Sequence, residues 1–331
     1  MAEDAEQQQA KCLVAPVTDM IIPSDSDANA LRAIAVVGPT ACGKTHRAVQ
    51  LASILNGEII SADSRQVYRN MDLGTGKYLY EYGDIRYHLI DICAPGSKYN
   101  LHKYLRDFNQ TYHDMLARGK RPVICGGSGM YVEHALNGIS LPEVPENSEL
   151  RHSLSHKSLD QLADILSGYK QLHNVTDIDT RSRAIRAIEI QDYYLRHPEA
   201  AISTSRRNAK PIDALIIGLD IPREERRARI SQRLQQRLAD GLIREIQDLL
   251  NSGIDAEDLI YYGLEYKYVT LHVMGELSYQ EMFNQLETSI HQFAKRQMTW
   301  FRGMERRGST IHWLPYDLED TEFETRVQEL L

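Results

Sequence analysis

The chain of 331 residues is long enough for about two domains, or for one large domain that carries an insertion. Hydrophobic residues make up 42% of it and charged residues 25%, which is ordinary for a soluble globular protein with a sizeable core. No window approaches the roughly 18 consecutive apolar residues of a transmembrane helix. The four cysteines are scattered without a Cys-x-x-Cys pair, which favours a reducing cytoplasm and argues against a structural metal.

The net charge of −8 is distributed unevenly. Residues 1–30 and residues 316–331 each hold one base and six acids, so each carries −5 and the remaining body carries +2. Within that body, residues 181–244 hold fourteen Arg or Lys against eight Asp or Glu, and residues 295–307 hold five against one. These basic stretches are compatible with a polyanionic partner, although arginines on helices are also common on solvated faces.

Residues 1–30 are polar and predict a disordered leader. Apolar and helix-periodic segments alternate after it, which predicts an α/β fold with a parallel sheet covered by helices on both faces. The expected strands are 33–37, 58–61, 88–90, 122–125, 214–219 and 310–314. The expected helices are 44–55, 101–118, 223–240, 242–250 and 279–307.

The alternation breaks between residues 141 and 179, where residues 150–172 predict two short helices and no strand. We therefore expect a small helical insertion at 141–179 within a catalytic core formed by 31–140 and 180–315. Residues 316–331 are expected to form an acidic C-terminal tail.

The first motif with chemical meaning is Gly38-Pro39-Thr40-Ala41-Cys42-Gly43-Lys44-Thr45, which matches the P-loop pattern in full. It follows a predicted buried strand and opens a predicted helix, as the mechanism requires. The backbone N–H groups and the helix N-terminus would surround a phosphate, with Lys44 as a point charge and the Thr45 hydroxyl on Mg²⁺. The loop therefore predicts a diphosphate or polyphosphate site, which by itself also suits a kinase that keeps ATP there.

Further motifs decide between these chemistries. The stretch from Asp63-Ser64-Arg65-Gln66 to Lys77, then His88-Leu89-Ile90-Asp91 and Gly126 to Tyr131, resembles the signature of the tRNA dimethylallyltransferases. The resemblance continues with Arg183 to Glu189, Arg229-Ile230-x-x-Arg233, Gly241-Leu242-x-x-Glu245 and Lys295 to Arg302. The blocks occur in the family's order and cover residues 31 to 315, so the fold expected is a P-loop NTPase-like one.

This resemblance implies a P-loop that binds dimethylallyl diphosphate with Mg²⁺ instead of ATP. The N6 amine of an adenosine 3′ of the anticodon would attack the allylic carbon, in tRNAs that read codons starting with U. Asp63 is the expected base for the amine, Ser128 its hydrogen-bonding neighbour, and Arg229 a further clamp on the diphosphate. The alternatives are a turn aspartate at Asp63 and a surface arginine at Arg229.

The family's tRNA contacts match a set of polar residues in this chain. They are Asp63, Ser64, Arg65, Gln66, Arg151, Ser182, Arg183, Arg186, Lys295, Arg296, Gln297, Thr299, Trp300 and Arg302. Trp300 and Phe301 suit base stacking, but an aromatic pair on a long helix is more often part of the core. We expect a monomer with no membrane partner.

Two segments depart from the family's pattern, at residues 173–179 and 263–268, and both belong to its tRNA-facing side. The catalytic core is therefore better supported than the nucleic-acid substrate. The nearest alternative is an adenylate isopentenyltransferase, which modifies AMP, ADP or ATP to make cytokinins. A P-loop NTPase that binds RNA without prenyl chemistry would share the basic helices and the loop.

Overall fold

The computed structural model describes residues 32–170, 176–199 and 210–331. The predicted leader at 1–30 and part of the departing segment at 173–179 lie outside the described residues. No helix among the described residues is long and apolar enough to cross a membrane.

A six-stranded sheet forms the centre of the molecule, with strand order β3-β2-β4-β1-β5-β6 and parallel pairing throughout. The expected α/β fold with a parallel sheet is confirmed, and the strands lie close to their predicted bounds. They are β1 Ala33–Val37, β2 Gly57–Ser61, β3 Tyr87–His88, β4 Arg121–Gly126, β5 Ala214–Asp220 and β6 Ile311–Pro315.

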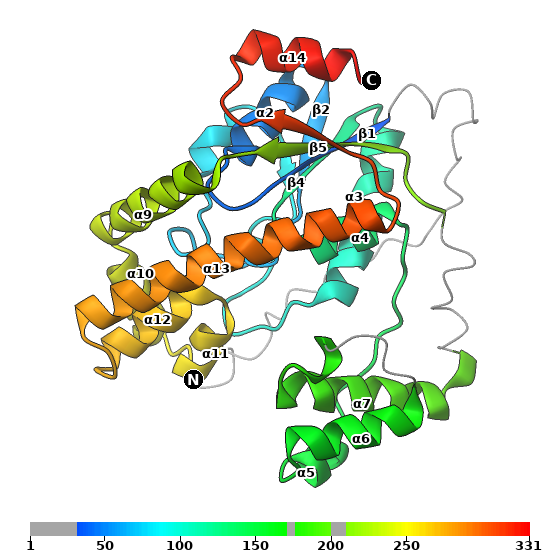
Figure 1. The fold of residues 1–331 in the computed structure, drawn as a ribbon, viewed down its shortest axis with the longest axis vertical. Helices are drawn as coiled ribbons and strands as arrows, with labels where there is room; N and C mark the ends of the chain where they lie inside the picture. Colours follow the sequence, from blue (N-terminus) through cyan, green and yellow to red (C-terminus); the bar gives the residue numbers. More distant parts are fainter. Residues whose placement is uncertain (1–31, 171–175, 200–209) are drawn as a thin grey trace, which may run out of the picture.

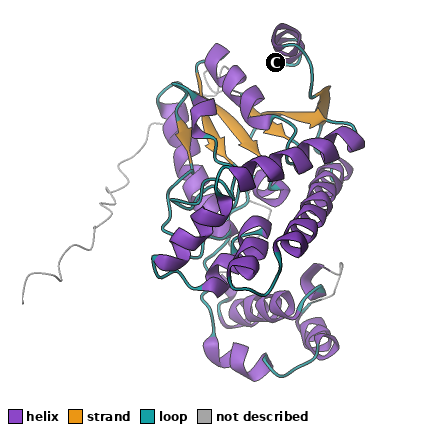
Figure 2. Cartoon of the chain, turned by 90° about the vertical axis from the view of Figure 1, so that its left-hand side faces the viewer, coloured by secondary structure: helices purple, strands orange, loops and turns teal. Residues whose placement is uncertain are grey.

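Alternate residues of β1 enter two separate hydrophobic clusters, so both faces of the sheet are covered. Ala35 packs into the larger cluster, with α3 (Leu101–Ala117) and α4 (Gly129–Leu136). Ile34 packs into the other, with α2 (Lys44–Ile54). Since every residue of β1 is buried, its short apolar run needs no polar alternation. Figure 2 shows helices on both sides of the strands.

The arginine-rich helix and the long C-terminal helix lie side by side, below the strands in the view of Figure 1. They are α9, Arg223–Ala239, and α13, Tyr279–Arg306. Ser278 and Glu281 form a capping box that fixes the start of α13. Between α9 and α13 along the chain lie α10 Leu242–Asn251, α11 Ala256–Tyr261 and α12 Leu264–Val273.

The helical insertion is larger than the sequence predicts. The two expected helices are present as α5, Ser148–Leu154, and α6, Leu159–Tyr169. A third helix, α7 (Arg181–Arg196), which we assigned to the core, packs on α6 and buries Ala184 and Ile188 in the insertion's own hydrophobic cluster. The three helices stand apart from the sheet in Figure 1.

The acidic C-terminal segment ends in a packed helix, α14 (Asp320–Gln328). Phe323 and Val327 are buried in the cluster that covers one face of the sheet. Arg47 of α2 pairs with Asp320 at 2.8 Å, and its guanidinium lies 4.5 Å from the centre of the Phe323 ring. The segment thus ends in a helix that packs against the P-loop helix α2, where Asp320 and half-buried Glu324 bond to Arg47 and Gln50.

Glu58 on β2 generates a prediction about acid stability. Its buried carboxylate accepts two hydrogen bonds from Arg118, at 2.5 and 2.7 Å, and lies 2.7 Å from the His88 ring. The hydrogen bond from Arg118 outweighs the effect of burial and lowers the pKa of Glu58 from 4.5 to about 2. Its contribution to stability is therefore present above pH 4.5 and is lost as the pH falls toward 2.

We expect Glu58→Gln to lower the free energy of unfolding at pH 7 by about 3 kcal/mol. It should also flatten the pH dependence of stability below pH 4.5, as measured by urea unfolding at several pH values. Asp114→Asn is the control, because exposed Asp114 also pairs with Arg118, at 2.9 Å and should cost less than about 1 kcal/mol. If the free energy of unfolding of Glu58→Gln falls as steeply below pH 4.5 as that of the unmodified protein, this assignment is contradicted.

Candidate active site

Three loops meet at the carboxyl edge of the sheet, after β1, β2 and β4. The strand order places β4 between the other two, so the loops after them are neighbours. The loop after β1 is the P-loop, the loop after β2 carries Asp63, and the loop after β4 carries Ser128. In open parallel sheets this edge is where ligands bind.

The P-loop has the backbone geometry of an anion site. Gly43 adopts a left-handed conformation with φ 87° just before α2 begins, and Ala41 has φ 66°. No side chain caps α2, so the first N–H groups of the helix face the loop without a side-chain acceptor. The Lys44 ammonium donates to the Pro39 carbonyl at 2.6 Å and so lies folded along the loop.

Asp63 and Ser128 are brought together by the loops after β2 and β4. The Ser64 N–H donates to the Ser128 hydroxyl at 3.3 Å, and the Ala62 N–H donates to the Cys125 carbonyl at 2.7 Å. The Arg65 N–H donates to Oδ1 of Asp63 at 2.8 Å. This bond closes the turn at Asp63 and fixes the orientation of its carboxylate.

Gly126 allows these two loops to approach. A Cβ atom at Gly126 would overlap the backbone of Ala62, so only glycine fits at the end of β4. Since the Ala62 backbone leads directly into Asp63, the glycine sets how close Asp63 comes to Ser128.

Gln297 of α13 links the P-loop to the loop after β4. Its buried side chain accepts from the Thr40 N–H at 2.8 Å and donates to the Gly127 carbonyl at 2.9 Å. The sequence predicts Gln297 as a tRNA contact, and the structure shows both ends of its amide bonded within the protein. Only the packing of α13 on the loops reveals this positioning role.

A pocket of about 510 Å³ opens beside the P-loop, between it and α9. It is lined by Ala41, Gly43, Tyr78, Arg229, Gln232, Arg233 and Gln236. The predicted clamp Arg229 is exposed and lies 5.1 Å from the centre of the Tyr316 ring. The wall of the pocket is therefore cationic and faces the loop that is built for phosphate.

Arg233 is the residue of this pocket that the sequence prediction missed. Its Nε is buried without a hydrogen-bond partner, and among the described residues Arg233 forms no ion pair, although its partly buried side chain lies against Tyr78. Burial and the neighbouring Arg237 lower its pKa, while Tyr78 and the charge of Glu265 oppose them; an arginine stays charged at neutral pH. A partly buried cation without an ion pair is stabilised when an anion joins it. Its position four residues after Arg229 on α9, which puts both side chains on one face of the helix, is the sequence feature that could have identified it.

The expected tRNA residues of the core have different surroundings. Lys295, Arg296, Thr299 and Arg302 are exposed on α13. Arg65 lies with its guanidinium 5.3 Å from the Tyr261 ring centre, and Gln66 is bonded to Ser61 at 3.0 Å. Phe301 is fully buried, which confirms it as core, while Trp300 is partly buried and packs against the same cluster, and its contact with tRNA stays a prediction.

In the insertion, two of the predicted tRNA contacts serve the structure. Arg151 binds buried Glu189 through two hydrogen bonds of 2.9 Å, and Arg186 pairs with the same carboxylate. Burial opposes ionisation of Glu189, but the bonds from Arg151, the Asn147 N–H and Arg186 outweigh it and lower its pKa. Arg183 and Ser182 are exposed, and Arg183 pairs with Asp179 at 2.7 Å.

Comparison with known proteins agrees with this geometry. The family model for IPP transferase matches residues 66–304, and the model for isopentenyl transferase matches residues 31–82. The chain is 56% identical to tRNA dimethylallyltransferase 1 of Parabacteroides distasonis, over 87% of this chain and 94% of that protein. It is 58% identical to tRNA dimethylallyltransferase 2 of Bacteroides fragilis, over 86% and 93%. The chain belongs to the IPP transferase family.

Solved structures show the same fold. A tRNA isopentenylpyrophosphate transferase from Bacillus halodurans superposes with a TM-score of 0.64 at 30% identity, covering 91% of this chain and 94% of that one. A eukaryotic dimethylallyltransferase acting on tRNA gives a TM-score of 0.73 at 20% identity, covering 90% and 77%. The resemblance drawn from the motifs is thereby confirmed.

Gln297 gives a prediction for this site. Gln297→Ala removes the acceptor of the Thr40 N–H and the donor to Gly127, so the P-loop loses its tie to the neighbouring loop. We expect the KM for the diphosphate substrate, which we call the donor, to rise about tenfold. The melting temperature should also fall, since a buried group left unbonded costs about 1–3 kcal/mol. Steady-state kinetics with varied donor measures the effect.

The control is Gln280→Ala, at the exposed start of the same helix, where the side chain bonds only Asn284, at 2.9 Å. It should leave the donor KM unchanged. A donor KM that does not move in Gln297→Ala would show that the P-loop holds its shape without this amide.

Proposed function

We propose that this protein transfers the dimethylallyl group of dimethylallyl diphosphate to N6 of the adenosine 3′ of the anticodon in tRNA. The observation that carries the proposal is the junction of the P-loop with the Asp63 and Ser128 loops at one edge of the sheet. A site for diphosphate and an oriented carboxylate then face the same space. The names of the relatives, tRNA dimethylallyltransferase, support the same reaction.

Asp63 would act as the base. The N6 lone pair forms a bond to the allylic carbon while the bond from that carbon to the diphosphate oxygen breaks, and the amine proton passes to the Asp63 carboxylate. Because the Arg65 N–H holds Oδ1, Oδ2 would face the amine. The Ser128 hydroxyl, already hydrogen-bonded to the Ser64 N–H, would orient the same amine.

The departing diphosphate needs its growing charge neutralised. The N–H groups at the start of α2 and the Lys44 ammonium would bind it from the P-loop side. Arg229 and Arg233 would bind it from the α9 wall of the pocket. Arg233 is better placed than the predicted clamp Arg229, because its side chain is partly buried with an unbonded Nε while Arg229 is exposed.

Magnesium belongs to this proposal. The described residues contain no group of three or more His, Cys, Asp or Glu that would hold a metal by themselves. Mg²⁺ fits a site with one or two protein ligands and substrate phosphates, and the half-buried Thr45 hydroxyl is such a ligand. When bound, the ion would stabilise negative charge on the diphosphate.

The acceptor is the finer part of the proposal. Exposed Lys295, Arg296 and Arg302 extend basic charge along α13 away from the pocket, and a free nucleotide would not need it. We propose tRNAs that read codons starting with U as acceptors, and the cytoplasm as the place of the reaction. The chain would act as a monomer.

Asp63→Asn tests the base. The amide keeps the acceptor for the Arg65 N–H but does not take a proton, so kcat should fall by about 10²–10⁴ while donor binding and the melting temperature stay unchanged. Incorporation of labelled dimethylallyl diphosphate into tRNA measures kcat. The control is Asp84→Asn at an exposed position, which should be silent. Near-normal turnover by Asp63→Asn would remove the base from the mechanism.

The acceptor is tested by offering labelled donor and Mg²⁺ with bulk tRNA in one tube and AMP in another. We expect label in tRNA alone, and its position by nuclease mapping beside the anticodon. Label in AMP alone would favour the adenylate isopentenyltransferase. A parallel titration with ATP and with the allylic donor distinguishes a nucleotide hydrolase, which would bind and cleave ATP without responding to the donor.

A further inference from the structure

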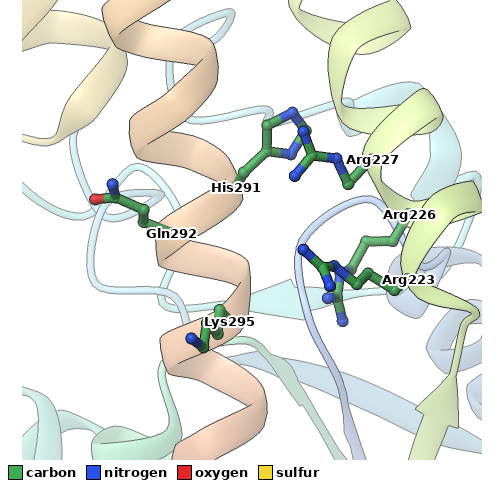
Figure 3. A pocket seen from close by; sticks show the side chains of 6 residues that line it. All are labelled: Arg223, Arg226, Arg227, His291, Gln292 and Lys295. Atoms are coloured by element: carbon green, nitrogen blue, oxygen red, sulfur yellow. The ribbon is translucent and has the colours of Figure 1, made fainter.

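A second pocket, which we call the basic pocket, lies between α9 and α13 and measures about 340 Å³. It is lined by Arg223, Arg226, Arg227, His291, Gln292 and Lys295. Figure 3 shows the guanidinium groups of the three arginines reaching from α9 toward α13. The basic pocket shares no lining residue with the pocket beside the P-loop, so it is a separate site.

The cations of the basic pocket lack acidic partners. No carboxylate lines it, and in the described part of the chain Arg226, Arg227 and Lys295 form no ion pair. Arg223 reaches only exposed Glu224, at 3.9 Å. Burial and the charges of Arg223 and Arg302 lower the pKa of Arg226, although the charge of Asp220 opposes them. Such a cluster is stabilised by a bound anion.

His291 adds a neutral polar group to the same wall. Burial and the charge of Arg227 lower its pKa, although Glu287 opposes them, so the ring is neutral at pH 7. Its Nδ1 is buried without a hydrogen-bond partner. A ring of this kind beside two guanidinium groups suits a ligand that offers several acceptor oxygens, as a phosphate group does.

The position of the pocket indicates which phosphate it receives. Lys295, which lines the pocket, lies two residues before Gln297, whose side chain accepts from the Thr40 N–H of the P-loop at 2.8 Å, so a ligand here lies close to the P-loop. The diphosphate already has the P-loop and its own cationic wall. Lys295 begins the exposed basic row of α13 that includes Arg296 and Arg302, and a polynucleotide follows such a row with successive phosphates.

We propose that the basic pocket binds a backbone phosphate of the RNA acceptor, near the nucleotide that enters the active site. The proposal rests on the proposed function, because it takes RNA as the acceptor. Phosphate contacts position the RNA without reading its sequence, so the pocket would contribute affinity and register.

The test uses Arg226→Gln, Arg227→Gln and the double variant in the full chain. Each single variant should weaken tRNA binding about fivefold at fixed salt, and the double variant should reduce the slope of log K against log salt by about 1 to 2. Filter binding with unmodified tRNA measures both. The tRNA KM should rise with the dissociation constant, while kcat and the donor KM stay unchanged.

Two controls separate a phosphate contact from a general charge effect. Arg227→Lys keeps the charge and should retain most of the affinity and the salt slope. Arg244→Gln removes an exposed arginine of α10 that lies outside the pocket and pairs with Asp248 at 3.6 Å; it should bind tRNA as the unmodified protein does.

Each result decides the proposal. Unchanged tRNA affinity and salt slope in the double variant would overturn it, as would a raised donor KM with unchanged tRNA binding, which would assign the pocket to the diphosphate. If the unmodified protein binds tRNA but transfers no prenyl group, the proposed function fails, and the role of the pocket is still read from the binding data.

Discussion

A single buried carboxamide, that of Gln297, connects the phosphate loop to the rest of the active site. It accepts from the Thr40 N–H and donates to the Gly127 carbonyl, so one side chain fixes the spacing of two loops and the depth of α13 against both. Because the other residues of α13 are carried on a rigid helix, this contact also sets where Lys295 and Arg302 face. Together with the buried apolar residues of α13, these two hydrogen bonds set the position of the basic row relative to the diphosphate site.

The arginines of this protein divide by whether the fold already neutralises them. Arg151 and Arg186 both bind Glu189, and removing either would leave a buried carboxylate underpaired, so they hold the insertion together. Arg233 in the P-loop pocket and Arg226 in the basic pocket have no such carboxylate among the described residues. A residue-by-residue match to the family's tRNA contacts does not distinguish arginines that form ion pairs from arginines that do not. The reason is that the fold determines which carboxylate lies beside each arginine.

The central strands are predicted well because they are short, apolar and buried on both faces, as the run Ala33–Val37 shows, whereas the edge strand β3, Tyr87–His88, is half-buried and shares one residue with its predicted range. The sequence also predicted the P-loop and the loop of Asp63, where the local pattern itself defines the geometry. It placed α7 in the core, since helical periodicity does not say which apolar surface a helix covers. The roles of Gln297 and Arg233 stayed hidden for the same reason, because each depends on contacts between segments far apart in the chain.

The departing block at residues 263–268 acts on the active site through packing. It begins α12, and Tyr266 is buried there with its hydroxyl donating to Glu245 at 2.6 Å. Glu245 in turn accepts from the backbone N–H groups of Asp72, Leu73 and Gly74, which hold the segment after Asp63 in place. The block therefore supports the loop that leads from Asp63 to Tyr78.

The same block also decides which of two neighbouring arginines is left for substrate. Glu265 binds Arg237 at 2.9 Å, while Arg237 also donates to the Tyr78 hydroxyl at 3.2 Å. Arg233 also lies against Tyr78, with its guanidinium 5.3 Å from the ring centre. Glu265 forms its ion pair with Arg237 and acts on Arg233 only through its charge, which raises the pKa of Arg233 while burial and Arg237 lower it. The block therefore holds Arg237 in an ion pair and leaves Arg233, which forms none among the described residues, at the wall of the pocket where the diphosphate would leave.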